Sequence, residues 1–183
     1  LKSDMRLENK YKKETIKKLR EKFGYKNDLA APKLAKAVVN VGVGKQAKEK
    51  NYIESVENNL ALITGQKPIK TRAKKAISAF KIKEGMVVGV SVTLRGKRMY
   101  DFVERLINIS FPRIRDFRGI SEKQVDRQGN LTIGFREHLA FPEISFQEVD
   151  SVHGLEVSVA TTAKTKEEGL ELFKLLGFPF KKE

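Results

Sequence analysis

Hydrophobic residues recur at helical spacing in four stretches of the chain. The first runs from Leu7 to Phe23, and Gly24 can end it because glycine readily adopts the left-handed backbone of a helix C-terminus. The third starts at Lys97, and Pro112 is predicted to stop it. The last runs from Lys166 to Leu176. The second predicted helix starts with Asn51 and Glu54, which resemble a capping box, and Gly65 ends it. The four apolar stripes are Leu7, Tyr11, Ile16, Leu19 and Phe23; Tyr52, Val56, Leu60 and Ile63; Met99, Phe102, Val103, Leu106 and Ile109; and Leu170, Phe173 and Leu176.

Four other stretches alternate between hydrophobic residues and small or polar ones, which is typical of β-strands with one buried face. Two are long and run from Lys36 to Val43 and from Met86 to Arg95. The two shorter strands place Leu131, Ile133 and Phe135, and then Leu155, Val157 and Val159, on one side. This order of elements predicts an α+β fold, a single domain over residues 1–183 whose antiparallel sheet has helices packed on one face.

A long basic loop, residues 64–85, separates the second predicted helix from the second long strand. Its segment TGQKPIKTRAKKAISAFKIK holds seven Lys or Arg and no Asp or Glu, which is half of the formal net charge of +14. Apolar residues lie among the cations, so they are expected to fix the shape of a long loop or irregular hairpin with its cations outward. Loops of this length in compact domains are usually functional or disordered.

A polyanion is the partner expected for such a loop, because each cation can displace a counterion condensed on a phosphate backbone. Phe80 adds a face on which a base can stack. If the two long strands share a sheet, Asn40 and Thr93 lie on its flat, polar face, beside the loop. The alternatives are a mobile basic loop and a solvated sheet face, and charge alone does not separate RNA, DNA and an anionic membrane.

Three further segments each leave two interpretations open. The basic face of the N-terminal helix suits RNA or solvent. The string FPRIRDFRGI places Arg113, Arg115 and Arg118 around a phenylalanine, for contact with phosphate or for pairing with Asp116. The segment HLAFPEISFQEVD, residues 138–150, suits a contact with a protein or a loop tucked into the core.

Composition excludes several kinds of chemistry. The chain has no cysteine, and His138 and His153 are two lone histidines at no recognised metal spacing, so no metal or cofactor is expected. GVGKQA, Gly42 to Ala47, loosely matches a dinucleotide-binding pattern but lacks the acidic residue that a ribose needs about twenty positions on. No apolar run approaches the roughly 20 residues of a membrane span, and the start lacks the core of a signal peptide. The protein is therefore expected to stay where it is made.

Two other classes of protein stay open on the residues alone. A nucleotide-dependent enzyme would need GVGKQA to bind a dinucleotide. A protein-only interaction module would place the basic loop on an acidic partner.

Several longer strings, in unbroken order from about Tyr11 to the C-terminus, carry a resemblance to a known family. They are TGQKP at Thr64, TRAKKAISAFKIKEG at Thr71, VTLRG at Val92, PRIRDFRG at Pro112, FPEI at Phe141 and LLGFPF at Leu175. With these strings the chain resembles the family of large ribosomal subunit protein five, the universal protein that binds 5S ribosomal RNA, in its bacterial or organellar form. Only Val87 and Val88 depart from the more usual pair after Met86.

The resemblance implies a function without catalysis and a set of site residues. It implies that the 5S RNA recognition surface contains Asn40, Gln66, Phe80 and Thr93, with Lys67 and Arg95 beside them. It implies that the loop tip, with Arg72, Lys74, Lys75 and Ser78, approaches transfer RNA in the peptidyl site. It further implies that segments near Pro112 to Gln128, with the three arginines, and Arg136 to Val149 face small-subunit protein thirteen across an intersubunit bridge. The implied partners also include 23S-type ribosomal RNA and other proteins of the central protuberance, in a cytoplasmic or organellar ribosome and with no membrane.

Overall fold

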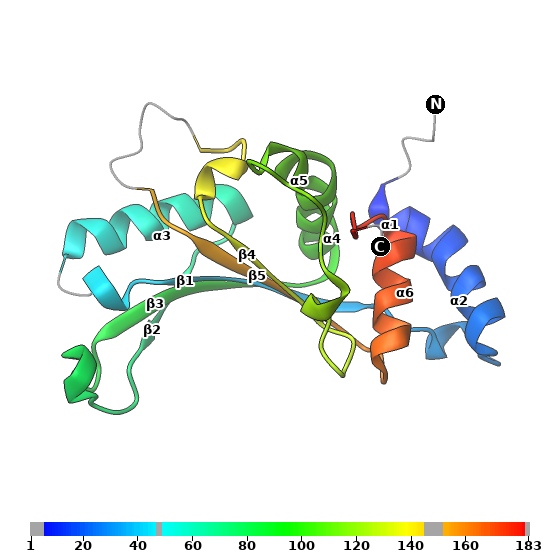
Figure 1. Ribbon diagram of the computed structural model, residues 1–183, viewed down its shortest axis with the longest axis horizontal. Helices are drawn as coiled ribbons and strands as arrows, with labels where there is room; N and C mark the ends of the chain where they lie inside the picture. Colours follow the sequence, from blue (N-terminus) through cyan, green and yellow to red (C-terminus); the bar gives the residue numbers. More distant parts are fainter. Residues whose placement is uncertain (1–5, 47–48, 145–151, 182–183) are drawn as a thin grey trace. The chain divides into compact units, whose positions relative to one another are not determined.

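The computed structural model describes residues 6–46, 49–144 and 152–181 (Figure 1). Five strands form one sheet in the order β2-β3-β1-β5-β4, and β2 pairs with β3 antiparallel. The strands are β1 (Leu34–Gly42), β2 (Ile69–Arg72), β3 (Val87–Leu94), β4 (Leu131–Phe135) and β5 (Leu155–Thr161). The helices are α1 (Leu7–Lys10), α2 (Ile16–Phe23), α3 (Lys50–Thr64), α4 (Gly96–Arg105), α5 (Phe111–Arg113) and α6 (Lys166–Leu176). The predicted α+β class with an antiparallel sheet is confirmed.

The packing divides the chain into two compact units. Unit 1 comprises Leu1–Ala37, Leu94–Ile133 and Ser158–Glu183, and unit 2 comprises Val38–Thr93 and Gly134–Val157. The assignment of residues 1–183 to one functional domain stays a prediction. Among the described residues, no helix is long and apolar enough to cross a membrane.

In unit 2, α3 covers one face of the sheet (Figure 1). The buried side chains on this face are Val39 and Val41 of β1, Val90 and Val92 of β3, and Ile53, Val56, Leu60 and Ile63 of α3. Lys70 lies opposite Val90 in the β2–β3 register, and its Nζ is 2.8 Å from Oε2 of Glu57 on α3. Because directly opposed residues of paired strands point to the same side, this ion pair places α3 on the valine face. The opposite face of these strands is not covered by α3.

Two details of the α3 prediction are wrong. Ile53 is buried where the sequence pattern placed Tyr52, which is only partly buried. The residue that precedes the helix is Glu49, and no side chain caps it, so Asn51 and Glu54 form no capping box. The helix starts two residues earlier than a capping box at Asn51 would require. Burial of its apolar side chains, and not a side-chain cap, determines where the helix forms.

In unit 1, π-helical turns interrupt both of the longer helices. Tyr11–Thr15 joins α1 to α2, and Leu106–Ser110 joins α4 to α5, so the helical chain continues through Pro112 instead of ending there. The wider π-turn rotates the residues that follow it around the helix axis. As a result Ile109 is 40% exposed, against the prediction, and Phe111 is buried in its place.

The last helix, α6, has the predicted bounds, but its buried stripe includes Leu172, whereas Leu170 is only partly buried. The Thr165 hydroxyl accepts a hydrogen bond from the Glu168 N–H (3.3 Å) at its start, and Gly177 ends it at φ +102°. Gly169 of this helix lies against the backbone of the turn at Gly129, where a side chain on either residue would overlap the other segment. The turn before β4 is thus fixed by contact with α6.

Candidate nucleic-acid interface

The basic loop folds as an irregular β-hairpin in unit 2. Beyond the paired strands β2 and β3, the Ala73 N–H donates to the Met86 carbonyl (2.8 Å) and the Gly85 N–H donates to the Ala73 carbonyl (2.9 Å). A bridge between Ile77 and Ile82 closes the tip around a 3-10 turn at Ser78–Phe80. Of the two predicted forms, the irregular hairpin is the one observed.

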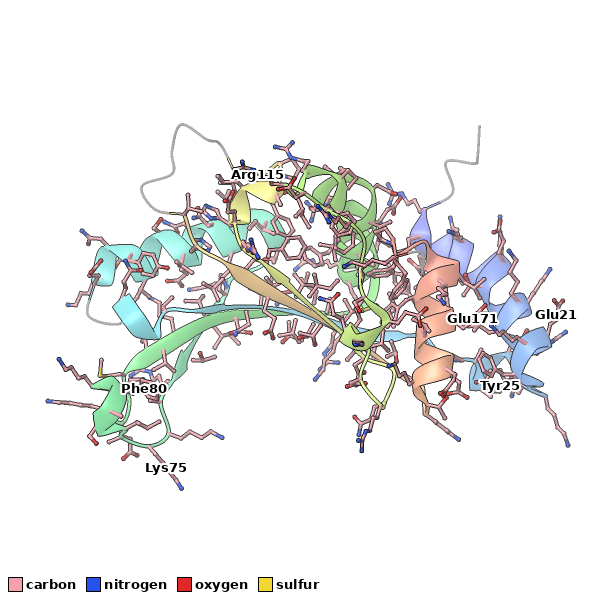
Figure 2. The ribbon with its side chains drawn as sticks, viewed as in Figure 1. Glu21, Tyr25, Lys75, Phe80, Arg115 and Glu171 are labelled. Atoms are coloured by element: carbon pink, nitrogen blue, oxygen red, sulfur yellow. The ribbon has the colours of Figure 1, made fainter. Side chains whose placement is uncertain are left out.

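The cations of this hairpin face outward, as predicted. Lys70 is paired with Glu57 (2.8 Å), whereas no carboxylate among the described residues lies within 4.0 Å of the six other cationic side chains. These six are Lys67, Arg72, Lys74, Lys75, Lys81 and Lys83, and all are exposed. Lys75 and Phe80 project from the tip (Figure 2), and the Phe80 side chain is 72% exposed.

The prediction that apolar residues fix the shape of the loop is wrong in one respect. Ile69, Ile77 and Phe80 are exposed, so they bury little surface within the hairpin. The backbone hydrogen bonds of the hairpin and the bridge at its tip hold its shape instead. Its apolar side chains are therefore available to a partner.

Two residues that the resemblance implied lie on the open face of the sheet in unit 2, and a third is hydrogen-bonded to one of them. Asn40 of β1 and Thr93 of β3 are on the side opposite the buried valines. The Gln66 Nε2 donates a hydrogen bond to the Thr93 carbonyl (3.1 Å), which brings the turn after α3 to the end of β3. That turn begins at Gly65 (φ +66°), and the Thr64 hydroxyl there donates to the Leu60 carbonyl (2.6 Å).

A shallow cavity of about 450 Å³ lies beside this turn. It is lined by Glu57, Asn58, Ala61, Gly65, Gln66, Lys67 and Pro68. Gln66 and Lys67 therefore line a depression next to α3. Phe80 is the exception in the implied set, because it is at the hairpin tip.

Thr71 also lies on the open face, and the sequence did not reveal it. Thr71 pairs with Gly89, as Ile69 pairs with Ser91, so the open face extends onto β2 and carries the exposed side chain of Ile69 beside that of Thr71. The segment TRAKK reads as loop in the sequence, since its alternation is too short to predict a strand. Only the pairing with β3 shows which side of the sheet Thr71 takes.

The other predicted cations belong to unit 1. Arg95, Arg113, Arg115 and Arg118 are all exposed (Figure 2 labels Arg115). No ion pair joins Asp116 to the last three within the described ranges, so the alternative of internal pairing is not observed. The segment is held by the stacking of Phe117 on the buried Phe111, with ring centroids 5.3 Å apart and planes 13° apart.

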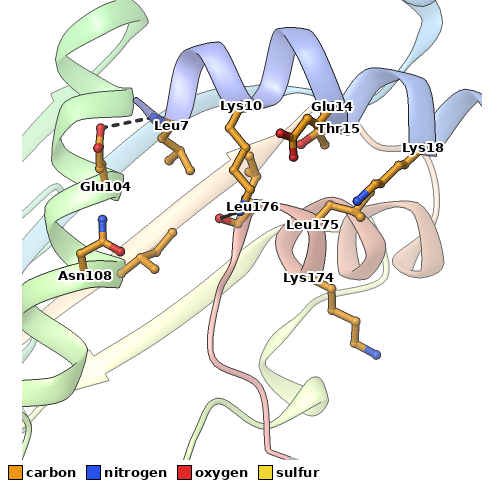
Figure 3. Close-up of a pocket in the computed structure, with 11 residues that line it drawn as sticks. Leu7, Lys10, Glu14, Thr15, Lys18, Glu104, Asn108, Lys174, Leu175 and Leu176 are labelled. Atoms are coloured by element: carbon orange, nitrogen blue, oxygen red, sulfur yellow. Dashed lines mark hydrogen bonds between the residues drawn. The ribbon is translucent and has the colours of Figure 1, made fainter. Parts of the chain in front are cut away.

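A larger cavity of about 630 Å³ lies in unit 1 and contains none of the predicted site residues (Figure 3). It lies among the N-terminal helix, the second π-turn and the end of α6. Lys10 Nζ donates to the Leu176 carbonyl (3.2 Å) across it, and the Leu7 N–H donates to Glu104 Oε2 (3.3 Å). These contacts join the three helical segments.

The two histidines are not isolated, contrary to the sequence interpretation. His138 and His153 are buried in unit 2 and stack with ring centroids 4.0 Å apart and planes 4° apart. Burial lowers the pKa of His138. Burial, together with repulsion by a charged His138 ring, lowers the pKa of His153 to about 4. No group of three His, Asp or Glu suited to a metal ion occurs in the described part of the chain. The pair is a neutral element of the core at neutral pH.

Three predicted segments extend beyond the described residues. Ala47 of GVGKQA lies outside them, and Gly44–Gln46 forms a 3-10 turn between β1 and α3. Residues 145–149 of the segment Arg136 to Val149, and residues 145–150 of HLAFPEISFQEVD, also lie outside. Within the described part of the latter, Phe141 and Ile144 are buried, so this part is tucked into the core.

An uncharged polar sheet face next to a hairpin of unpaired cations is an arrangement typical of RNA-binding proteins. Comparison with protein families identifies the chain more closely. The family model described as "Ribosomal protein L5" matches residues 27–83, and the model of the C-terminus of the same ribosomal family matches residues 87–180. The chain belongs to the ribosomal protein L5 family.

Relatives named large ribosomal subunit protein uL5 match almost the whole chain. That of Halothermothrix orenii is 52% identical over 174 residues, which cover 95% of this chain and 97% of the relative. That of Desulforapulum autotrophicum is 53% identical over 175 residues, covering 96% and 98% respectively. That of Desulforamulus reducens is 50% identical over 177 residues, covering 97% and 98%.

Proposed function

We propose that this protein is a structural constituent of the large ribosomal subunit that binds 5S ribosomal RNA in the central protuberance. Membership of the ribosomal protein L5 family gives it a structural, non-enzymatic role in the cytoplasmic ribosome and an association with ribosomal RNA. The observation that carries the finer proposal is the open face in unit 2, where neutral hydrogen-bonding side chains border a hairpin with six cations that have no carboxylate partner in the described part of the chain.

The cations supply affinity in this proposal. If about six cations of the protein neutralise 5S RNA phosphates, raising salt from about 50 to about 200 mM should weaken binding roughly a thousandfold, because each contact releases a condensed counterion. The open face supplies selectivity. The Asn40 amide, the free oxygen of the Gln66 amide and the Thr93 hydroxyl can bond to ribose hydroxyls or to exposed bases. Lys67 and Arg95 are assigned to the same RNA.

The hairpin tip is assigned to transfer RNA in the peptidyl site. Support comes from its exposed cations Arg72, Lys74 and Lys75 and from Ser78. Phe80, whose exposed ring offers a stacking face, is assigned to 5S RNA. Arg113, Arg115 and Arg118 of unit 1 are assigned to an RNA or to small-subunit protein thirteen across an intersubunit bridge. Contacts with 23S-type ribosomal RNA and with other proteins of the central protuberance complete the assignment.

A filter-binding titration with 5S RNA tests the central proposal, with a transfer RNA as competitor at two salt concentrations. We expect a preference for 5S RNA that survives the higher salt. Asn40→Ala with Thr93→Ala should lose that preference while the far-UV circular dichroism stays unchanged, since both side chains lie outside the core. Equal binding to both RNAs by the unaltered protein would contradict the proposal.

A charge-matched comparison isolates the role of the hairpin. Lys74→Gln with Lys75→Gln removes two cations of the hairpin tip, so the slope of log affinity for transfer RNA against log salt should fall by about two. Lys26→Gln with Lys123→Gln removes the same charge from exposed positions of unit 1. The control pair should leave the slope nearly unchanged; equal changes in both double variants would show that only net charge matters.

A further inference from the structure

Gly89 leaves space on the open face of unit 2, and the polar side chains of Thr71 and Asn40 lie next to this space. A Cβ built on Gly89 would lie 2.6 Å from Thr71 Oγ1, 3.2 Å from the Val41 carbonyl oxygen and 3.6 Å from Asn40 Oδ1. Thr71 belongs to β2 and Asn40 to β1, so the side chains approach across β3 from both sides. The Thr71 hydroxyl can take this position only because residue 89 has no side chain, whereas 3.6 Å is an ordinary contact distance for Asn40.

The hydroxyl of Thr71 and the amide of Asn40 have no hydrogen-bond partner among the described residues. Gln66 differs, because its amide already donates to the Thr93 carbonyl (3.1 Å). Thr71 is exposed and Asn40 is partly buried, so both can reach a partner. Together they present donors and acceptors aimed at one small region above β3.

The chemistry of this pair favours a neutral ligand group. Lys70, the neighbour of Thr71, lies on the opposite face and is paired with Glu57 (2.8 Å), so it does not add charge here. A phosphate is bound best by cations, whereas an amide and a hydroxyl suit a group that both donates and accepts. The 2′-hydroxyl of ribose is such a group, and the shallow minor groove of A-form RNA displays it to a flat surface.

We propose that Thr71 and Asn40, brought together over Gly89, bind a ribose 2′-hydroxyl and so make the face selective for RNA. This inference rests on the proposed function and adds Thr71 and Gly89 to its residues. Thr71 contacts the ribose directly, and Gly89 is a positioning residue that acts through the space it leaves.

Interference mapping with 5S RNA in which 2′-deoxynucleotides replace ribonucleotides at random tests the assignment. Bound and unbound RNA are separated on filters and sequenced. With the unaltered protein, deoxy substitution should be depleted from the bound fraction at a small number of positions. With Thr71→Val, which removes the hydroxyl at nearly constant shape, at least one of these positions should lose its depletion and overall affinity should fall about five- to tenfold.

The shared contact gives a second requirement. Asn40→Leu should remove the effect at the same RNA position as Thr71→Val, and Gly89→Ala should do so too, provided that its circular dichroism spectrum matches that of the unaltered protein. Thr132→Val, at an exposed threonine of β4, is the control and should keep the full pattern.

Identical interference patterns for the unaltered protein and Thr71→Val would overturn the inference. So would binding that is weakened by altered bases in the RNA and not by 2′-deoxyriboses. Either result leaves the proposed function standing, because the protein would still select 5S RNA. Failure of the unaltered protein to select 5S RNA would instead refute the proposed function itself.

Discussion

The stacked histidines predict that unit 2 loses stability as the pH falls from about 6.5 towards 4. The pKa of His153 is about 4 in the folded protein and 6.5 as its ordinary value, mainly because burial disfavours the charged ring. Between pH 6.5 and pH 4 His153 therefore binds a proton in the unfolded chain but not in the folded chain. Since each pH unit between the two pKa values changes the free energy of unfolding by about 1.4 kcal/mol, the full loss is about 3 kcal/mol.

The contacts of the pair explain why protonation is unfavourable. His138 Nδ1 lies 3.2 Å from the His153 backbone nitrogen, from which an unprotonated Nδ1 accepts a hydrogen bond, and 3.2 Å from the His153 carbonyl oxygen, to which a protonated Nδ1 donates. The Asn59 amide lies 3.3 Å from His153 Nε2. The hydrogen bond with the His153 backbone and the charge of Glu137 raise the pKa of His138, and they do not overcome the effect of burial, which lowers it. A second positive charge 4.0 Å away from the first would add repulsion.

Urea unfolding at pH 7.5 and pH 5.0, followed by circular dichroism, measures this contribution by difference. The unaltered protein should lose about 2 kcal/mol more between these pH values than His153→Gln, in which the group no longer titrates. The carboxylates are common to both proteins, so their effects cancel. Equal losses in the two proteins, or an imidazole signal of His153 that titrates near pH 6.5 by NMR, would refute the reasoning.

Three other changes test the packing and the hairpin. Leu60→Ala should lower the free energy of unfolding by about 2–5 kcal/mol because Leu60 is fully buried, whereas Leu62→Ala, at an exposed position of the same helix, should change it by less than about 0.5 kcal/mol; urea titration compares them. Gly169→Ala should cost about 1–3 kcal/mol, because its Cβ would overlap the Gly129 backbone, and an unchanged melting temperature would contradict this contact. Phe80→Ala should weaken 5S RNA binding, measured by filter binding, by about 1–3 kcal/mol because a stacking face is lost. It should leave the melting temperature, measured by calorimetry, unchanged because the Phe80 side chain is exposed.

The secondary structure was largely predictable because burial on one side of an element leaves a period in the sequence. The strands β1 and β3 and the bounds of α6 follow directly from it. The errors fall where a local irregularity breaks the period. The π-turn at Leu106–Ser110 moves the buried face from Ile109 to Phe111, and nothing in the hydrophobic pattern marks such a turn.

The candidate site was predictable in its charges and incomplete in its geometry. The unpaired cations of the hairpin were visible as a run of Lys and Arg, because charge is a property of the residue itself. Asn40 and Thr93 were visible as polar members of alternating strands. Thr71 was missed because its place depends on which residue of β3 it faces.

The sequence by itself determined the class of fold, the basic hairpin and, through its long matching strings, the family. Each of these depends on residue types and on spacing within one segment. The tertiary structure alone decided which distant residues meet: the stacking of His138 on His153, the turn at Gly129 against α6, and the convergence of Thr71 and Asn40 over Gly89. Such contacts depend on strand register and on the absence of a side chain at one point, and neither leaves a periodic trace along the chain.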